Sequence, residues 1–154
     1  DLARDLLAKG GAKIVLPVDN VLADRIDIQQ GDIGNLQTTP VDAIPDGWCG
    51  VDIGPQTLDR FAEILRSART VVWNGPMGVF ELAAAAEGTF ALARLMAAIT
   101  ADGATTVIGG GDSARAVSDA GVADQVSHVS TGGGASLEML EGKILPGVAA
   151  LTDK

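Results

Sequence analysis

Apolar residues between positions 55 and 68 recur at every third or fourth position. This spacing places Leu58, Phe61 and Leu65 on one face of a helix, with polar residues around the rest. Pro55 suits the first position of a helix, because the amide hydrogen that proline lacks would have no partner there. The pattern therefore predicts an amphipathic helix over 55–68.

Two further segments show the same helical spacing. A second helix is predicted over 82–100, with Leu92 on its inward stripe and Gly88 as a break near its start. Leucines close to the beginning of the chain predict another helix, which the pair of glycines starting at Gly10 ends.

Between the helices lie short runs that are mainly apolar and do not alternate with polar residues. They occur at 13–19, 70–73 and 105–108, and once more where "HVS" precedes a glycine triplet. Strands without alternation are typical of a parallel sheet with helices on both faces. We therefore expect a three-layer α/β/α fold with a mostly parallel, Rossmann-like sheet. Residues 27–50 are rich in Gly, Pro, Asn, Asp and Gln and predict loops, with one short strand at most.

The length and the net charge of the chain limit the number of domains and the kinds of binding partner. The chain has 154 residues, enough for one domain with its own core, and a formal net charge of −9. This charge argues against unspecific binding to nucleic acids or anionic membranes, which needs clustered Lys and Arg. The single cysteine, Cys49, excludes an internal disulfide. With no apolar run of membrane-spanning length, we expect a soluble cytoplasmic protein.

Three glycine-rich loops follow predicted strands and precede helices. They read "WNGPMG" at 73–78, "GGGDS" at 109–113 and "TGGG" at 131–134. The first amides of a helix have no intrahelical partner and carry about half a positive charge, and glycines let a phosphate approach them. None of the loops matches the dinucleotide fingerprint or the P-loop. The pattern predicts a phosphate site made by backbone amides and not by lysine.

Each chemical interpretation has a structural alternative. Glycine triplets also occur where tight turns need a positive φ. Asp112 is placed either to hold magnesium or to cap the following helix, and spacing alone favours the cap. Glu81 either complements a helix dipole or accepts from ribose hydroxyls. Asn74 either orients a nucleotide or shapes its turn.

Several long motifs together resemble the C-terminal domain of phosphoglycerate kinases. They are "LPVD", "IPDGWCGVDIGP", "VVWNGPMGVFE", "IGGGDSARAV" and "HVSTGGGASLEMLEGKILPGVAAL", in the family's order and spacing. The resemblance runs from the first predicted helix to the end of the chain. Ser113 stands where the family often has threonine. Serine at this position retains the hydroxyl group.

The resemblance implies an activity and a domain assignment. Members of this family transfer a phosphoryl group reversibly between 1,3-bisphosphoglycerate and ADP, with Mg²⁺, and work in glycolysis. Residues 1–154 would be part of the C-terminal, nucleotide-binding domain, incomplete on its N-terminal side. 3-Phosphoglycerate would bind only to the absent N-terminal domain, and the full enzyme would be a monomer.

The resemblance also assigns roles to residues. For the nucleotide, the residues are Gly50, Asn74, Gly75, Pro76, Glu81, Gly110, Gly111, Asp112 and Ser113. Asp112 would hold Mg²⁺. The backbone amides that serve the transferring phosphoryl group would belong to Gly111, Gly132, Gly133 and Gly134.

The resemblance further implies that the chain is inactive alone and binds MgADP or MgATP weakly at best. "GGAK" at 10–13 looks like the family's glycine-lysine loop but precedes a different strand, so Lys13 is not counted as a phosphate ligand. Two other readings stay open. The chain is either a stand-alone module for another phosphorylated ligand, or a structural remnant that associates through an exposed sheet edge.

Overall fold

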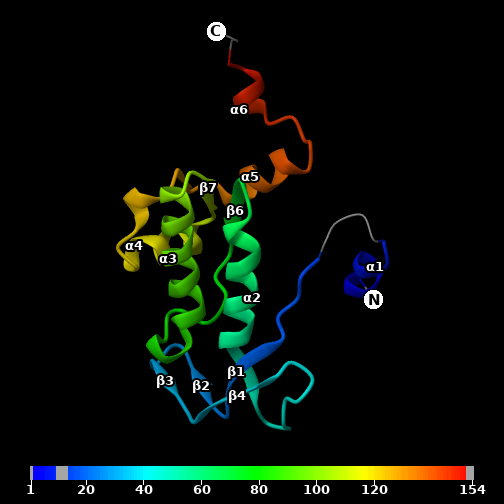
Figure 1. The fold of residues 1–154 in the computed structure, drawn as a ribbon, viewed down its shortest axis with the longest axis vertical. Coiled ribbons are helices and arrows are strands. Elements are labelled where there is room, and N and C mark those ends of the chain that lie inside the picture. The colour runs from blue at the N-terminus through cyan, green and yellow to red at the C-terminus, as the bar shows by residue number, and fades with distance from the viewer. Residues whose placement is uncertain (1, 10–13, 152–154) are drawn as a thin grey trace.

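The computed structural model describes residues 2–9 and 14–151 of the chain. The helices are α1 Leu2–Ala8, α2 Pro55–Arg66, α3 Glu87–Ala101, α4 Gly111–Asp119, α5 Gly133–Leu140 and α6 Pro146–Ala149, with 3-10 turns η1 Ala83–Ala85 and η2 Ala123–Gln125. The strands are β1 Asp19–Ala23, β2 Ile26–Asp27, β3 Asp32–Ile33, β4 Leu36–Pro40, β5 Cys49–Ile53, β6 Thr70–Asn74, β7 Thr105–Gly109 and β8 His128–Ser130. Helices α2 and α3 run side by side between the β1–β4 region and the parallel strands (Figure 1).

The predicted parallel sheet is present, with strand order β6-β7-β8. Trp73 pairs with Ile108 in the register, and both are buried beneath α3 and α4. On the opposite face, Val72 and Val107 line a hollow of about 380 Å³ together with residues of α5. Helices therefore lie on both faces, which confirms the α/β/α class. The second face is thinly covered, because Val72 is 43% exposed.

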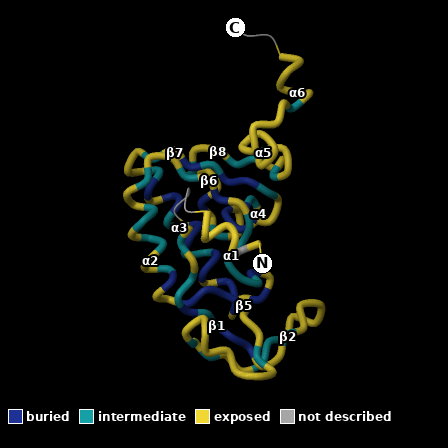
Figure 2. The backbone as a smooth tube through the Cα atoms, turned by 90° about the vertical axis from the view of Figure 1, so that its right-hand side faces the viewer, coloured by how far each residue is buried: buried dark blue, intermediate teal, exposed yellow. Residues whose placement is uncertain are grey.

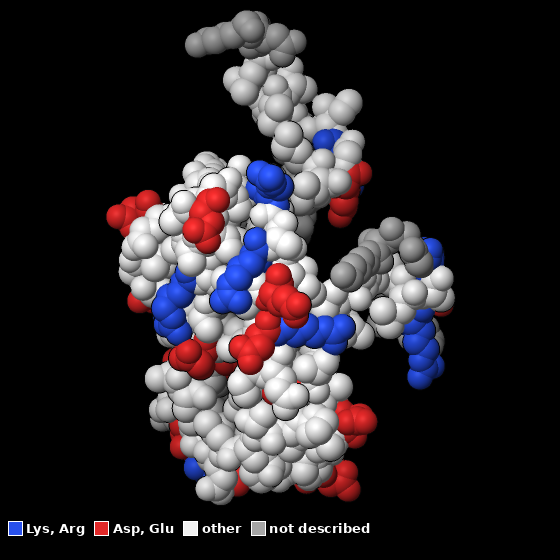
Figure 3. Space-filling view, viewed as in Figure 1, with Lys and Arg blue, Asp and Glu red and all other residues white. Residues whose placement is uncertain are grey.

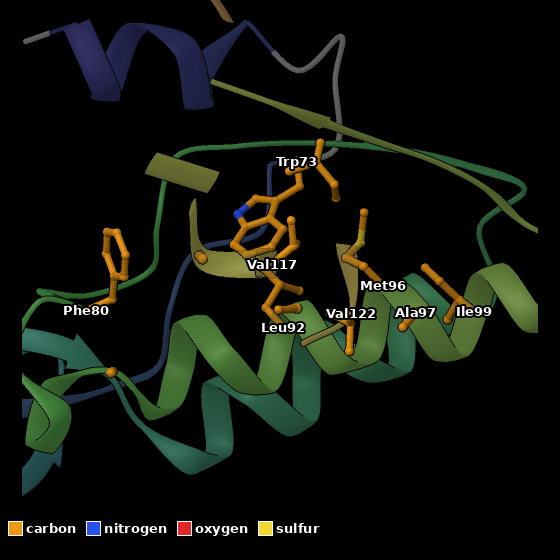
Figure 4. Packing of buried hydrophobic residues seen from close by; sticks show 12 residues of the cluster. Trp73, Phe80, Leu92, Met96, Ala97, Ile99, Val117 and Val122 are labelled. Carbon is orange, nitrogen blue, oxygen red and sulfur yellow. The ribbon is translucent and has the colours of Figure 1, made fainter. Parts of the chain in front are cut away.

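The main core lies between the parallel sheet and the helices α3 and α4 (Figure 4). The apolar face of α3 contributes Leu92, Met96 and Ile99, and α4 contributes Val117. Met96 and Val117 are completely buried. Burying a side chain of this size stabilises a fold by about 1.5–3 kcal/mol. This packing fixes where α4 begins, at the carboxyl end of β7.

Residues 27–50 contain more strand than the composition predicts. Strand β1 lies between β4 and β5 in an antiparallel sheet, and β2 pairs with β3. In β4 the half-buried side chains are Gln37 and Thr39, which alternate with exposed residues. The prediction of loops was wrong because the inward positions of β4 are polar. A two-residue period of this kind does not appear in the hydrophobic pattern.

The predicted strand at 13–19 is also wrong in its position. Residues 14–18 are not in a strand, and β1 begins at Asp19. Pro17 has no amide hydrogen for a sheet ladder, and Leu16 is 52% exposed. Residues 10–13 lie outside the described residues, and with them the predicted helix end at Gly10 and the "GGAK" sequence.

Gly88 does not break the predicted second helix. Helix α3 begins at Glu87, after the separate turn η1, and Gly88 is a buried residue of its first turn. A Cβ atom at this position would collide with the carboxylate of Asp52. A glycine is required here because a neighbouring strand packs against the start of the helix.

Two helices at the ends of the described chain stand away from the body. Figure 1 shows α1 and α6 away from the body of the protein, and Figure 2 colours both helices mainly as exposed. Leu2 of α1 is 74% exposed, and Leu151, just after α6, is 73% exposed. Among the described residues, the helices are too short or too polar to cross a bilayer.

Asp19 caps α2 from a different element. The helix begins after Gly54, which offers no side-chain cap. Asp19 instead accepts hydrogen bonds from the amides of Gln56 and Thr57, at 3.0 and 2.8 Å, and from the Thr57 hydroxyl at 2.6 Å. The carboxylate is 2% exposed. A strand residue therefore holds the start of α2 against the antiparallel sheet.

We expect Asp19→Ala to lower the free energy of unfolding by about 2–3 kcal/mol, because the amides of Gln56 and Thr57 lose their acceptor. The Thr57 hydroxyl keeps an acceptor in the variant, since it also donates to the backbone carbonyl of Asp19 at 3.0 Å. Chemical denaturation followed by circular dichroism measures this. The matched control is Asp27→Ala, which removes an exposed carboxylate that accepts from the Gln30 amide. A loss for Asp19→Ala no larger than for Asp27→Ala would contradict the capping role.

The effect of Asp19 depends on pH. Burial raises the pKa of Asp19, but hydrogen bonds from the Thr57 hydroxyl and the amides of Gln56 and Thr57 outweigh burial and hold the pKa below its ordinary value. Its stabilisation is therefore present above the unfolded pKa of about 3.9 and is lost as the pH falls through the lower folded value. The stability difference between the native chain and Asp19→Ala should shrink over that acidic range.

Candidate functional site

The three strands of the parallel sheet end at one edge, and the glycine loops meet there. The amide of Gly110 donates to the carbonyl of Ser130 at 3.2 Å, which joins the loop after β7 to the end of β8. A Cβ atom on Gly133 would lie 2.6 Å from the Cα of Gly110. A Cβ atom on Gly110 would lie 2.7 Å from Oδ1 of Asn74, at the end of β6. The loops after β6, β7 and β8 are therefore in direct contact.

Within each triplet, some glycines are required by the fold and others are not. Gly110 has φ +92°, a conformation that favours glycine. At Gly133, the backbone of Gly110 lies so close that there is no room for a side chain. In contrast, a Cβ atom on Gly111 or Gly134 would meet nothing within 4 Å. Packing explains the first pair. The second pair leaves bare backbone facing open space at the same edge.

Helices α4 and α5 both begin at this edge without a side-chain cap. Their N-cap residues are Gly110 and Gly132, and neither helix has a side-chain hydrogen bond at its N-cap. The first amides of each helix have no partner within the helix and lie at its positive end. The three loops contain neither lysine nor arginine. This arrangement suits an anion that backbone donors bind.

Asp112 is not the N-cap that its spacing favoured. Gly110 occupies the N-cap position, and Asp112 is an exposed residue in the first turn of α4. The described residues contain no cluster of three or more acidic, histidine or cysteine side chains that could hold a metal. A single exposed carboxylate fits Mg²⁺ that also binds phosphate oxygens and waters, and does not fit a closed zinc site.

Ser113 is turned into the protein. Its side chain is completely buried, and its hydroxyl oxygen accepts a hydrogen bond from the Gly75 amide at 2.7 Å. The resemblance implied that this residue contacts the nucleotide. In the structure, its hydroxyl connects the start of α4 to the turn after β6.

The remaining nucleotide candidates lie along the segment after β6 and in the antiparallel sheet. Asn74 and Glu81 are exposed, and Gly75 has φ +96°. Gly50 lies in β5, in the antiparallel sheet. Its link to this segment runs through the next residue, Val51, whose carbonyl accepts from the Val79 amide at 2.8 Å.

Asp52 is a residue of this region that sequence reasoning missed. It is 6% exposed and accepts hydrogen bonds from the amides of Gly88 and Ile53 at 2.7 and 2.8 Å. Burial raises the pKa of its carboxyl above the ordinary value, more than these amides lower it. Asp52 fixes the start of α3 against β5. The sequence signal that could have indicated this contact was Gly88. A glycine in the first turn of a helix indicates that a neighbouring residue, here Asp52, packs against its backbone.

Acidic and basic side chains are interspersed over α2 and α3 on the face shown in Figure 3. Basic residues there do not form a continuous stripe.

The comparisons with known proteins point to one family. The family model described as phosphoglycerate kinase matches residues 1–143. A phosphoglycerate kinase of Synechococcus elongatus is 57% identical over 99% of this chain and 38% of its own length. The chloroplastic phosphoglycerate kinase of Volvox carteri is 55% identical over the whole chain and 33% of its own length. The chain thus spans little more than a third of these curated relatives.

Solved structures agree with the sequence relatives. The phosphoglycerate kinase of Coxiella burnetii superposes with a TM-score of 0.82 at 39% identity, over 95% of this chain and 36% of that protein. The enzyme of Pyrococcus horikoshii superposes with a TM-score of 0.77 at 33% identity, over 97% of this chain and 35% of its own.

Proposed function

Because the chain belongs to the phosphoglycerate kinase family, we propose that it supplies the nucleotide side of an enzyme that moves a phosphoryl group reversibly between 1,3-bisphosphoglycerate and ADP. This transfer converts 1,3-bisphosphoglycerate and ADP into 3-phosphoglycerate and ATP, and the proposed pathway is cytoplasmic glycolysis. One observation carries the proposal for the site. Two uncapped helix N-termini meet at neighbouring strand ends, beside bare glycine backbone.

The proposed phosphate seat has two halves. The Gly111 amide binds the nucleotide phosphates beside Gly110, whose own amide donates to Ser130, and the amides of Gly132, Gly133 and Gly134 face the phosphoryl group in transfer. Phosphoryl transfer passes through a state in which negative charge spreads over the equatorial oxygens. Fixed amide dipoles stabilise that charge without reorganising. The open space at Gly111 and Gly134 supports this role, since nothing in the fold occupies it.

Asp112 is proposed to bind the magnesium of the magnesium-nucleotide complex. Its exposed carboxylate lies in the first turn of α4, beside the proposed phosphate amides. When bound, Mg²⁺ neutralises phosphate charge and orients the phosphates for in-line transfer. The carboxylate itself supplies one anionic oxygen ligand, which matches the way proteins share this ion with phosphates.

The nucleoside is proposed to lie towards Gly50 and the segment after β6. Glu81 accepts from ribose hydroxyls, and Asn74, Gly75 and Pro76 line the pocket. The exposure of Asn74 and Glu81 supports these roles. Ser113 takes part indirectly, because its hydroxyl oxygen already accepts from Gly75.

We expect the 154-residue chain to bind MgADP with a Kd near 1 mM, about −4 kcal/mol, and to be inactive in a coupled kinase assay. Transfer also needs positive groups and a positioned acceptor, which the three loops do not supply. Titration calorimetry with MgADP tests binding, and the same titration with ADP and EDTA is the control. Equal affinity with and without magnesium, or no saturation by about 5 mM, would contradict the proposal.

A further inference from the structure

The turn formed by residues 75–79, the pocket turn, has no free backbone amide. Gly75 donates to Ser113, Met77 and Gly78 donate to Oγ1 of Thr89 at 3.0 and 3.2 Å, and Val79 donates to a carbonyl of β5. Proline at position 76 has no amide hydrogen. The amides of this glycine loop are therefore committed inside the protein, unlike the first amides of α4 and α5.

Thr89 holds two of these amides with a single oxygen. It lies in the first turn of α3, its side chain is completely buried, and Gly88 beside it is held by Asp52. The hydroxyl oxygen of threonine has two lone pairs, and the amides of Met77 and Gly78 use both. The first turn of α3 thus fixes the middle of the pocket turn.

The opposite side of the pocket turn is held by β6. The indole nitrogen of Trp73, which is 5% exposed, donates to the carbonyl of Gly75 at 2.6 Å. The pocket turn is therefore anchored to α3, α4, β5 and β6 by buried groups. Asn74 precedes it directly and Glu81 follows two residues after it, so its conformation sets the position of both exposed side chains.

We propose that Thr89 is a positioning residue for nucleotide binding: it holds the pocket turn so that Asn74 and Glu81 stand ready for the nucleoside. Thr89 touches no ligand in this scheme. The inference rests on the proposed function. The three glycine loops then have different roles. The pocket turn orients the side chains of its neighbours, and the loops before α4 and α5 supply backbone amides.

The test compares Thr89→Val with Thr89→Ser in the 154-residue chain. Valine has the shape of threonine but leaves the Met77 and Gly78 amides buried without an acceptor. Serine keeps the oxygen. The control is Thr106→Val, since Thr106 is also completely buried and accepts an amide, from Ser127 at 3.1 Å in a different part of the sheet. Amide hydrogen exchange and titration with MgADP followed by NMR are measured for each variant.

In Thr89→Val, we expect faster exchange at Met77 and Gly78 and about tenfold weaker MgADP binding, because the competent turn is less populated. Thr89→Ser restores both, and Thr106→Val lowers stability without changing affinity. If Thr89→Val leaves exchange and affinity unchanged while the native chain binds MgADP, the positioning role is wrong and the proposed function stands. If the native chain does not bind MgADP, both fail. Should Thr89→Val not fold, the native chain is measured instead: saturating MgADP should slow amide exchange at Met77 and Gly78, and unchanged exchange at both amides would overturn the role.

Discussion

Gly133→Ala is expected to disrupt the glycine edge and to remove nucleotide binding. The added Cβ would lie 2.6 Å from the Cα and 2.9 Å from the amide nitrogen of Gly110, and backbone atoms do not give way as flexible side chains do. Overpacking of this kind costs about 1–3 kcal/mol. Thermal denaturation and MgADP titration of the 154-residue chain measure the two effects.

Gly134→Ala is the matched control, because it adds the same methyl group one residue later. The Cβ at this position meets nothing within 4 Å, and alanine in place of glycine within a helix stabilises by about 0.5–1 kcal/mol. We expect Gly134→Ala to be at least as stable as the native chain but to bind MgADP more weakly, since the methyl enters the space proposed for the phosphoryl group. Unchanged MgADP affinity in this variant would show that the glycines at 132–134 serve only the fold and do not bind a phosphate.

Asp112→Ala is expected to remove the magnesium dependence of nucleotide binding. Loss of one charged partner in such a contact costs about 2 kcal/mol of binding free energy. Stability should change by less than about 1 kcal/mol, because the carboxylate is exposed and is not the N-cap of α4. Calorimetry with ADP, with and without Mg²⁺, measures the effect.

The control for this variant lies on the same helix. Asp119 is also exposed and pairs with Arg115 at 3.4 Å, at the opposite end of α4. Asp119→Ala should leave MgADP affinity unchanged. If Asp112→Ala instead kept the magnesium effect and lost as much stability as a capping residue, the assignment of Asp112 to magnesium would be wrong.

The parallel sheet was predictable because its strands are buried on the side that packs against α3 and α4. Strands β6 and β7 read as continuous apolar runs, and helix α3 between them carries its apolar residues at helical spacing. The antiparallel sheet was not predictable in this way. Its β4 strand turns Gln37 and Thr39 inward, so the alternation involves polar residues only.

For the candidate site, the positions of the glycines and of Asp112 could be read from the sequence, but the role of each residue could not. The pattern placed glycines at strand ends, yet only contact distances distinguish Gly133, which the fold requires, from Gly134, which it does not. Likewise, Asp112 looked like a cap because it follows the glycines directly, but the helix already begins at Gly111. Thr89 gave no signal in the sequence, since its partners lie 11 and 12 residues away in a turn.

The central claim is that backbone amides at the starts of α4 and α5 bind the phosphates. Amide NMR spectra of the chain, recorded during titration with MgADP, test it most directly. The account predicts the largest shifts at residues 110–113 and 132–134, with smaller shifts in the pocket turn. Contradiction would come from unmoved signals at those residues with large shifts elsewhere, for instance around the hollow of about 370 Å³ that Arg66 and Arg69 line.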